Sequence, residues 1–269
     1  MSLPSPGPGG AALVTGASSG IGAEIARELV RRGHQVVLVA RTESKLVALA
    51  AELGGGAHAL ATDLSDREAR AGLPDRVAEL GLGVDILVNN AGFSTLGPVH
   101  RSDPDAEMRL VEVDVVAVVD LCSRFLPGMV ERGRGAVLNV ASTAAFQPLP
   151  GQAAYGGAKA FVLSYTHSLS GELAGTGVSA TVLCPGPVDT GFGEAAGFDP
   201  DEAQEALPAF LWVPAADVAR AAVDGLARGR TVVIPGVGNR AGAAFAQLAP
   251  RRLLVPLLAR RHPGLRQTH

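Results

Sequence analysis

The sequence contains few of the residues on which secreted, metal-binding and membrane-spanning proteins depend. Its two cysteines cannot build a disulfide framework and lack the spacing of metal ligands, so a reducing, cytoplasmic compartment without a metal site is expected. No apolar run approaches the roughly 20 residues of a membrane helix, and no basic segment followed by an apolar one opens the chain. We therefore predict neither a membrane span nor a signal peptide, and we expect a soluble protein. A formal net charge of -3 gives no reason to expect nucleic acid as a partner.

Short apolar runs rich in β-branched residues alternate with segments of helical period along the whole chain. Such runs are typical of parallel strands that are covered by helices on both faces. We therefore predict an α/β fold with a Rossmann-like doubly wound parallel sheet of about seven strands. The predicted strands are Ala11–Thr15, Gln35–Ala40, Ala57–Ala61, Ile86–Asn89, Ala136–Ala141, Val178–Leu183 and Thr231–Pro235. The predicted helices include Ile21–Arg32, Glu43–Leu53, Asp66–Glu79, Asp105–Glu131, Ala153–Ala174 and Ala215–Ala227.

The pattern indicates one domain with two short appendages. Residues 1–10 are rich in Pro and Gly and are expected to form a flexible lead. Residues 11–240 are expected to form a single Rossmann-like catalytic domain, and residues 241–269 a C-terminal helical extension. The extension ends in an apolar stretch, 251–261, that is flanked by arginines and too short to span a bilayer. Contact with another subunit or domain is its favoured role, and peripheral membrane contact is the less favoured alternative.

A glycine-rich turn follows the first predicted strand and leads directly into a helix. Its sequence is Thr15-Gly16-Ala17-Ser18-Ser19-Gly20-Ile21-Gly22. Glycines permit a tight turn and close approach of the backbone to a phosphate, which the helix N-terminus then attracts. A glycine-rich turn alone is a weak signal. Its place after the first strand of a βαβ series favours a dinucleotide site.

Arg41 follows the second predicted strand, where a carboxylate would hold the ribose of NAD. A guanidinium suits the 2′-phosphate of NADP instead, so NADP(H) is the predicted cofactor. The alternative for Arg41 is a solvated surface arginine. Asp63, after the third strand and before Leu64, is a candidate acceptor for the adenine amino group or, equally, the N-cap of the next helix.

The strongest signal is Tyr155-Gly156-Gly157-Ala158-Lys159, with Ser142 directly after the fifth predicted strand. Tyr and Lys four residues apart share one face of a helix. A nearby ammonium lowers the pKa of a phenol by favouring phenolate, and the phenol can then exchange a proton with a carbonyl or alcohol oxygen. Ser142 can orient and polarise that same oxygen. Lys45 and Lys159 are the only lysines in an arginine-rich chain, which favours a specific need for a compact charge at Lys159.

These motifs together resemble the short, single-domain branch of the short-chain dehydrogenase/reductase family. Asn89-Asn90-Ala91-Gly92, which closes the fourth strand, and Pro185-Gly186-Pro187-Val188-Asp189-Thr190 complete the resemblance, which covers residues 11–235. It implies an NADP-dependent oxidoreductase that acts on a carbonyl or alcohol and pairs as a dimer or tetramer. The catalytic residues it implies are Ser142, Tyr155 and Lys159. The cofactor-binding residues it implies are Gly16, Ser18, Ser19, Ile21, Arg41, Asp63, Leu64, Asn90, Tyr155, Lys159, Pro185, Gly186, Val188 and Thr190.

One position departs from the family pattern. The family usually has an asparagine in the long helix after the Asn-Asn-Ala-Gly motif, where it helps to hold a water that links the lysine to solvent. The matching residue here is Asp114. A carboxylate accepts from such a water but cannot donate to it, and its charge opposes formation of a phenolate. Asp114 is therefore included among the catalytic candidates, with its part in the proton relay left open.

Between Thr190 and Val213 glycines and prolines interrupt the regular pattern, in a segment that forms a lid over the substrate in members of the family. The aromatics Phe192, Phe198, Phe210 and Trp212 lie there. They indicate an apolar or aromatic-bearing substrate, or equally a loop that packs its own aromatics on the domain. Two other functions remain open from sequence. One is an NADP(H)-binding sensor without turnover, and the other is an isomerase or dehydratase on the same scaffold.

Overall fold

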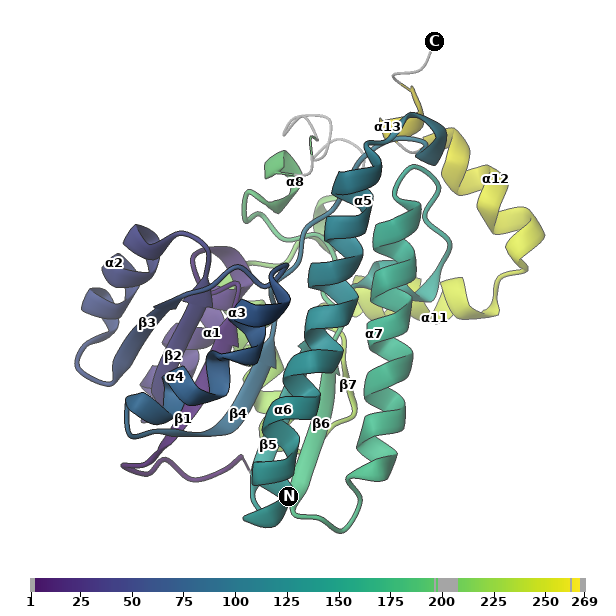
Figure 1. The fold of residues 1–269 in the computed structure, drawn as a ribbon. Coiled ribbons are helices and arrows are strands. Elements are labelled where there is room, and N and C mark those ends of the chain that lie inside the picture. The colour runs from purple at the N-terminus through teal and green to yellow at the C-terminus, as the bar shows by residue number, and fades with distance from the viewer. Residues whose placement is uncertain (1–2, 196, 198–207, 262, 267–269) are drawn as a thin grey trace.

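A seven-stranded parallel sheet forms the centre of the molecule (Figure 1). The computed structural model describes residues 3–195, 197, 208–261 and 263–266. The strand order is β3-β2-β1-β4-β5-β6-β7, so the order reverses between β1 and β4, where ligands bind in such sheets. The predicted fold class is confirmed. The strands are β1 (Gly10–Thr15), β2 (Gln35–Ala40), β3 (Ala57–Ala61), β4 (Gly83–Asn89), β5 (Gly135–Val140), β6 (Val178–Leu183) and β7 (Val232–Val233).

Helices cover both faces of the sheet, and each face has its own apolar core. The helices of one face are α1 (Gly20–Arg31), α2 (Glu43–Leu53) and α10 (Ala215–Ala227). Those of the other are α4 (Leu73–Glu79), α6 (Ala117–Glu131), α7 (Ala153–Glu172) and α11 (Val237–Leu248). Side chains of β1 alternate between the two cores, with Ala11 and Leu13 on one side and Ala12 and Val14 on the other, as the period of a strand requires. The other described helices are α3 (Arg67–Ala71), α5 (Pro104–Val111), α8 (Phe192–Ala195), α12 (Arg251–Arg261) and α13 (Pro263–Arg266), with 3-10 turns η1 (Val99–Arg101), η3 (Thr143–Phe146) and η4 (Ala209–Leu211).

Two predicted helices are wrong in their continuity. The helix predicted over residues 66–79 breaks at Gly72, because Pro74 lies in the first turn of α4 and cannot donate a backbone hydrogen bond. The helix predicted over residues 105–131 is interrupted by a π-helical turn, η2 (Glu112–Val116), that contains Asp114. The last strand is shorter than predicted, since Pro235 cannot take part as a donor in the ladder of an edge strand.

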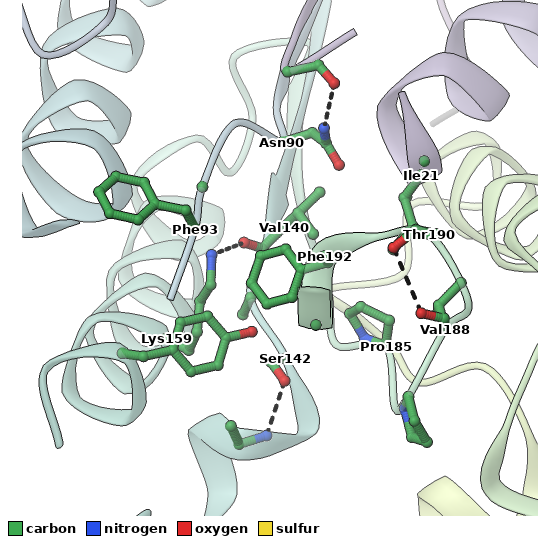
Figure 2. Close-up of a pocket in the computed structure, with 18 of the residues that line it drawn as sticks. Ile21, Asn90, Phe93, Val140, Ser142, Lys159, Pro185, Val188, Thr190 and Phe192 are labelled. Atoms are coloured by element: carbon green, nitrogen blue, oxygen red, sulfur yellow. Dashed lines mark hydrogen bonds between the residues drawn. The ribbon is translucent and has the colours of Figure 1, made fainter. Parts of the chain in front are cut away.

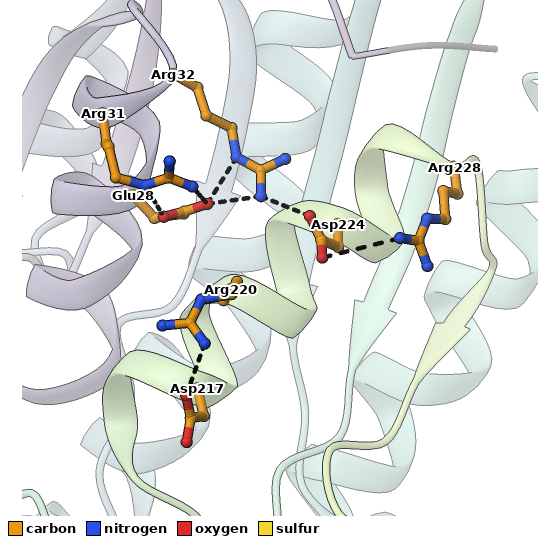
Figure 3. Close-up of polar contacts among 7 residues, drawn as sticks. All are labelled: Glu28, Arg31, Arg32, Asp217, Arg220, Asp224 and Arg228. Atoms are coloured by element: carbon orange, nitrogen blue, oxygen red, sulfur yellow. Dashed lines mark hydrogen bonds and ion pairs between the residues drawn. The ribbon is translucent and has the colours of Figure 1, made fainter.

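An ion-pair cluster joins α1 to α10 on one face of the sheet (Figure 3). The Glu28 carboxylate accepts from Arg31 and Arg32, and Arg32 also contacts Asp224 on α10 with 2.6 Å between Nη2 and Oδ1. Glu28 and Arg32 are largely buried, so this contact fixes two helices that are distant in sequence. The backbone of the lead is held at the opposite end of the strands from the cavity described below, where Gly83 donates to the Gly9 carbonyl at 2.8 Å. The division into lead, domain and extension stays a prediction.

Candidate active site

A cavity of about 890 Å³ lies over the carboxyl ends of the strands (Figure 2). A volume of this size is at the upper end of the range for ligand pockets. Every cofactor-binding residue predicted from the sequence lines the cavity, as do Ser142, Tyr155 and Lys159. Asp114 does not line it but lies directly behind Lys159. The structure therefore brings together the residues that the sequence singled out.

The glycine-rich turn between β1 and α1 leaves no room for side chains. Gly16 has a φ of +65°, and a Cβ added to it would lie 2.8 Å from the Ala91 Cα. The Asn90 amide donates to the carbonyls of Thr15 at 3.0 Å and Gly16 at 3.3 Å, so Asn90 ties the turn to the end of β4. This compact cradle at the N-terminus of α1 fits the pyrophosphate of a dinucleotide.

The other end of the same wall carries Arg41 and Asp63. Arg41 is exposed and lines the cavity. Asp63 accepts from the Ser65 amide at 2.9 Å and from its hydroxyl at 2.7 Å, whereas α3 is capped by Asp66. Asp63 is therefore not the N-cap of that helix, and this alternative is wrong. Burial acts to raise the pKa of Asp63, but the hydrogen bonds from Ser65 and the charges of Arg41 and Arg109 lower it overall, which keeps the carboxylate ionised.

Ser142, Tyr155 and Lys159 meet where β5 and α7 approach each other. The Ser142 hydroxyl accepts from the Ala144 amide at 3.1 Å, which leaves its proton free to donate, and it is hydrogen-bonded to the Tyr155 phenol. The Lys159 Nζ lies 5.5 Å from the centre of the Tyr155 ring and donates to the Val140 carbonyl at 3.3 Å (Figure 2). A proton donor, a polarising hydroxyl and a cation thus face one point of the cavity.

The carboxylate of Asp114 forms an ion pair with the lysine of this group. Its Oδ2 lies 2.9 Å from the Lys159 Nζ, and its Oδ1 accepts from the Phe93 amide at 3.0 Å. Both side chains are almost fully buried. Gly92 makes this placement possible, because a Cβ at that position would lie 2.8 Å from the Asp114 Oδ2. The last glycine of the Asn-Asn-Ala-Gly motif thus accommodates the carboxylate.

The π-helical turn that carries Asp114 is anchored on a second side by a buried arginine. Arg70 Nη2 lies 2.7 Å from Glu112 Oε1, in the same turn, and Arg70 Nε lies 3.0 Å from Asp120 Oδ2 in α6. Arg70 also donates to the carbonyl of Leu64, which lines the cavity. A π-turn holds one extra residue and is often found at functional sites. Here it is held by Arg70 on one side and by Lys159 on the other.

The three buried titratable groups influence one another strongly. Burial raises the pKa of the Tyr155 phenol, Lys159 and Ser142 act in the opposite direction, and the charge of Asp114 adds to the rise. The expectation of a lowered phenol pKa is therefore wrong for the site as a whole, although Lys159 acts in the expected sense. Burial acts to lower the pKa of Lys159, but Asp114 and Tyr155 raise it overall. Burial also raises the pKa of Asp114. At neutral pH the arrangement holds a protonated phenol beside an ammonium ion.

The segment from Pro185 to Thr190 closes the cavity on the side of β6. The Pro185 carbonyl accepts from the Thr143 amide at 2.9 Å, which fixes this segment next to Ser142. Asn239, on α11, was missed from the sequence. Its buried amide donates to the carbonyls of Leu211 and Pro235, and a Cβ on Gly186 would clash with it. A lone Asn in a weakly patterned helix gives no signal of this contact.

The aromatic residues predicted to cover the cavity divide into two groups. The Phe192 ring lies 5.8 Å from that of Tyr155, and Trp212 also lines the cavity. Phe210 instead is 72% exposed and lies against Gly238, outside the cavity lining. Phe198 lies outside the described residues. Further lining residues that the sequence reading missed are Phe93, Arg109, Leu149, Gln152, Leu211 and Leu258.

Comparison with known proteins matches this architecture. The family model of the short chain dehydrogenases matches residues 10–199. A short chain dehydrogenase of Pseudocercospora fijiensis is 42% identical over 191 residues, which are 69% of this chain and 62% of that relative. Serine 3-dehydrogenase of Rhizobium radiobacter is 37% identical over 68% of this chain and 74% of its own. Among solved structures, a short-chain dehydrogenase from Sphingobium yanoikuyae in complex with NADPH has a TM-score of 0.78 and 33% identity, covering 92% of this chain and 95% of its own.

Proposed function

The chain belongs to the short-chain dehydrogenase family, and from this premise we propose that it reduces an apolar ketone or aldehyde with NADPH, and oxidises the alcohol in reverse. The observation that carries the proposal is the convergence of Ser142, Tyr155 and Lys159 on one point of a cavity whose other wall is a dinucleotide cradle. An NADPH complex of a relative at 33% identity supports the cofactor. When bound, the cofactor supplies or accepts the hydride.

The protein's own residues manage the proton that accompanies that hydride. Ser142 donates a hydrogen bond to the carbonyl oxygen of the substrate, because its own acceptor capacity is already used by the Ala144 amide. Tyr155 gives its proton to the same oxygen as negative charge develops there. The ammonium of Lys159 stabilises the phenolate that is left. In the reverse direction the phenolate removes the proton of the alcohol.

Asp114 keeps Lys159 charged and in place. Without a partner, a lysine so deeply buried would lose its proton easily, and the ion pair at 2.9 Å opposes that loss. The same negative charge disfavours phenolate on Tyr155, so the site favours the protonated phenol that carbonyl reduction requires. We assign Asp114 as a positioning residue that acts through Lys159.

The chemistry of the cavity wall supports an apolar substrate. Apolar side chains surround the space beyond Tyr155, among them Phe93, Leu149, Phe192, Leu211 and Trp212. The basic residues that line the described part of the cavity are accounted for otherwise, since Arg41 and Arg109 act on Asp63 and Lys159 is paired with Asp114. A carboxylate-bearing substrate such as serine would thus find no free cation among the described lining residues. A ketone with an aliphatic or aromatic body fits this lining better.

NADP(H) is preferred over NAD(H) in this proposal because Arg41 lies free at the end of β2. Its guanidinium can form a charge-assisted, bidentate contact with a 2′-phosphate. No carboxylate stands in its place to hold the unmodified ribose. Asp63 is available to accept from the adenine.

The assembly and the compartment are further parts of the proposal. The outer sides of α6 and α7 expose Val130 and Phe161, and they support association of two or four copies through these helices. Cys122 and Cys184 are free and buried, which supports a reducing cytoplasm. No helix in the described part of the chain is long and apolar enough to cross a membrane.

A carbonyl panel tests the proposal. The purified full chain is mixed with NADPH or NADH and with apolar ketones, aldehydes, serine and 3-hydroxy acids, and the absorbance of reduced nicotinamide is followed. Reduction of apolar ketones with NADPH is the expected result. Tight binding of NADPH without turnover of any compound would contradict the proposal in favour of a sensor, and activity confined to serine or hydroxy acids would contradict the substrate class.

A further inference from the structure

The charges of the chain are divided unevenly between its two parts. From Gly225 to His269 there are eight arginines and no aspartate, glutamate or lysine. The preceding 224 residues carry all 26 acidic residues and only 15 basic ones. A formal charge of -3 for the whole protein therefore conceals a strongly basic C-terminal part attached to an acidic body.

The arginines of the two parts also differ in their partners. Arg31, Arg32, Arg220 and Arg228 each contact a carboxylate in the cluster on α1 and α10 (Figure 3). In contrast, the described structure gives no ion pair to three arginines of the extension, which are Arg240, Arg252 and Arg260. All three are exposed. Their charge is available to an external anion.

Exposed apolar side chains lie on the same two helices as these arginines. On α11, Phe245 is 67% and Leu248 85% exposed, and on α12, Leu253 is 65% and Leu257 48% exposed. Residues 253 and 257 are one helical turn apart, and so lie on one face. In Figure 1, α12 lies at the edge of the molecule, in yellow. We call the set Arg240, Phe245, Leu248, Arg252, Leu253, Leu257 and Arg260 the C-terminal patch.

The inner side of the extension is well packed, so the outward residues are not exposed for want of a fixed position. Leu254 is buried, and Leu258 lines the catalytic cavity. Arg251 donates to the carbonyl of Phe146 at 3.1 Å and so anchors the start of α12 on the domain. The alternating buried and exposed leucines of α12 thus give it one face toward the cavity and another toward the outside.

We propose that the C-terminal patch binds the surface of an anionic lipid membrane. Arginine heads can reach the phosphates while leucine and phenylalanine enter the boundary between headgroups and acyl chains. A second copy of the chain is a poorer occupant, because a twofold contact through this patch would place arginines against arginines. An apolar body without basic residues would leave the charge unused. The membrane alone satisfies both the charge and the apolar side chains.

The location has a consequence for the proposed function, on which this part of the inference rests. Leu258 and Ala246 lie on the inner sides of the same two helices and line the cavity. A patch bound to lipid would hold the cavity close to a bilayer in which an apolar ketone is dissolved. Membrane binding itself requires no turnover, so its test is independent of the activity.

Vesicle sedimentation tests the proposal with the full chain. Vesicles of phosphatidylcholine alone are compared with vesicles of phosphatidylcholine mixed with phosphatidylglycerol, at low and high salt. We expect co-sedimentation with the anionic vesicles that falls as salt rises, and little with the neutral ones. Arg252→Gln/Arg260→Gln and Leu253→Ser/Leu257→Ser should each weaken binding by roughly tenfold or more, since each removes one of the two contributions.

The matched control is Lys45→Gln/Arg67→Gln, which removes the same charge from exposed positions on α2 and α3 and should bind as the wild type does. NADPH binding by each variant checks that the fold is intact. Absence of wild-type binding to anionic vesicles overturns the proposal, as does equal loss in the control. If Leu253→Ser/Leu257→Ser changes the mass of the assembly in sedimentation velocity and leaves vesicle binding unchanged, the patch is a subunit contact and the proposal is wrong.

Discussion

At the scale of single residues, Asp114 is the position where this chain departs most from its family. The sequence predicted the position of this carboxylate and the conflict it causes, namely support for Lys159 and opposition to a Tyr155 phenolate. The structure adds the 2.9 Å ion pair and the absent Cβ of Gly92 that makes room for it. Neither contact could be read from the sequence, because residues 92, 114 and 159 meet only through the fold.

Replacement of Asp114 by Asn should shift the pH dependence of alcohol oxidation to lower pH. The Asp114 charge contributes to the raised pKa of Tyr155, so its removal lowers that pKa and makes the phenolate available at a lower pH. The profile of kcat against pH for the wild type and Asp114→Asn checks this. NADPH affinity should be unchanged. An unchanged profile in a folded variant would mean that the carboxylate does not act on the phenol.

Arg41 determines the choice of cofactor in this account. Arg41→Asp should weaken NADPH binding by about 1.5–3 kcal/mol and shift preference toward NADH, because it replaces a charge-assisted phosphate contact with repulsion. Dissociation constants for both cofactors, measured by titration, decide the matter. Arg67→Asp makes the same change away from the cavity and serves as control. Equal affinity of the wild type for NADPH and NADH would refute the role of Arg41.

At the scale of elements, the sequence predicted almost every strand and helix but misjudged their interruptions. Continuous apolar runs identified the parallel strands, since burial on both faces leaves no other pattern. The π-turn at Glu112–Val116 was missed because its cause is tertiary, in the contacts of Arg70 and Lys159. Gln152 and Asn239 were missed as well, since a polar residue on a helix shows its partners only after the helices have packed.

The contact between α1 and α10 should make stability depend on pH in the acid range. Hydrogen bonds from Arg31, together with those from Arg32, lower the pKa of Glu28 from an ordinary 4.5 to about 2. The stabilisation is therefore fully present above pH 4.5 and is lost as the pH falls toward 2.

Glu28→Gln should lower the free energy of unfolding at neutral pH by about 1–2 kcal/mol, a modest value because Arg31 is largely exposed to solvent. The difference from the wild type should shrink as the pH falls through the acid range. Urea unfolding at several pH values measures it, with Glu79→Gln, at an exposed site, as control. A difference that stays constant with pH would show that the Glu28 carboxylate is not stabilised by its arginines.

At the scale of the whole molecule, an acidic catalytic body and a basic helical extension share one cavity. Strands β1 and β4 place the cradle and the cavity at their carboxyl ends, while α11 and α12 complete its wall. The catalytic body could be predicted from sequence because its motifs belong to a recognisable family. The inward and outward sides of the extension could not, since they depend on how two short helices pack.

The central claim is that Tyr155 passes a proton to a carbonyl oxygen as NADPH reduces it. The most direct test compares NADPH-dependent carbonyl reduction by the wild type and by Tyr155→Phe, with NADPH affinity measured on the same samples. The account predicts a loss of turnover of about 10²–10⁴-fold with almost unchanged affinity, because only the proton donor is removed. A variant that keeps substantial reductase activity would contradict the claim, as would a wild type that binds NADPH and reduces no carbonyl compound.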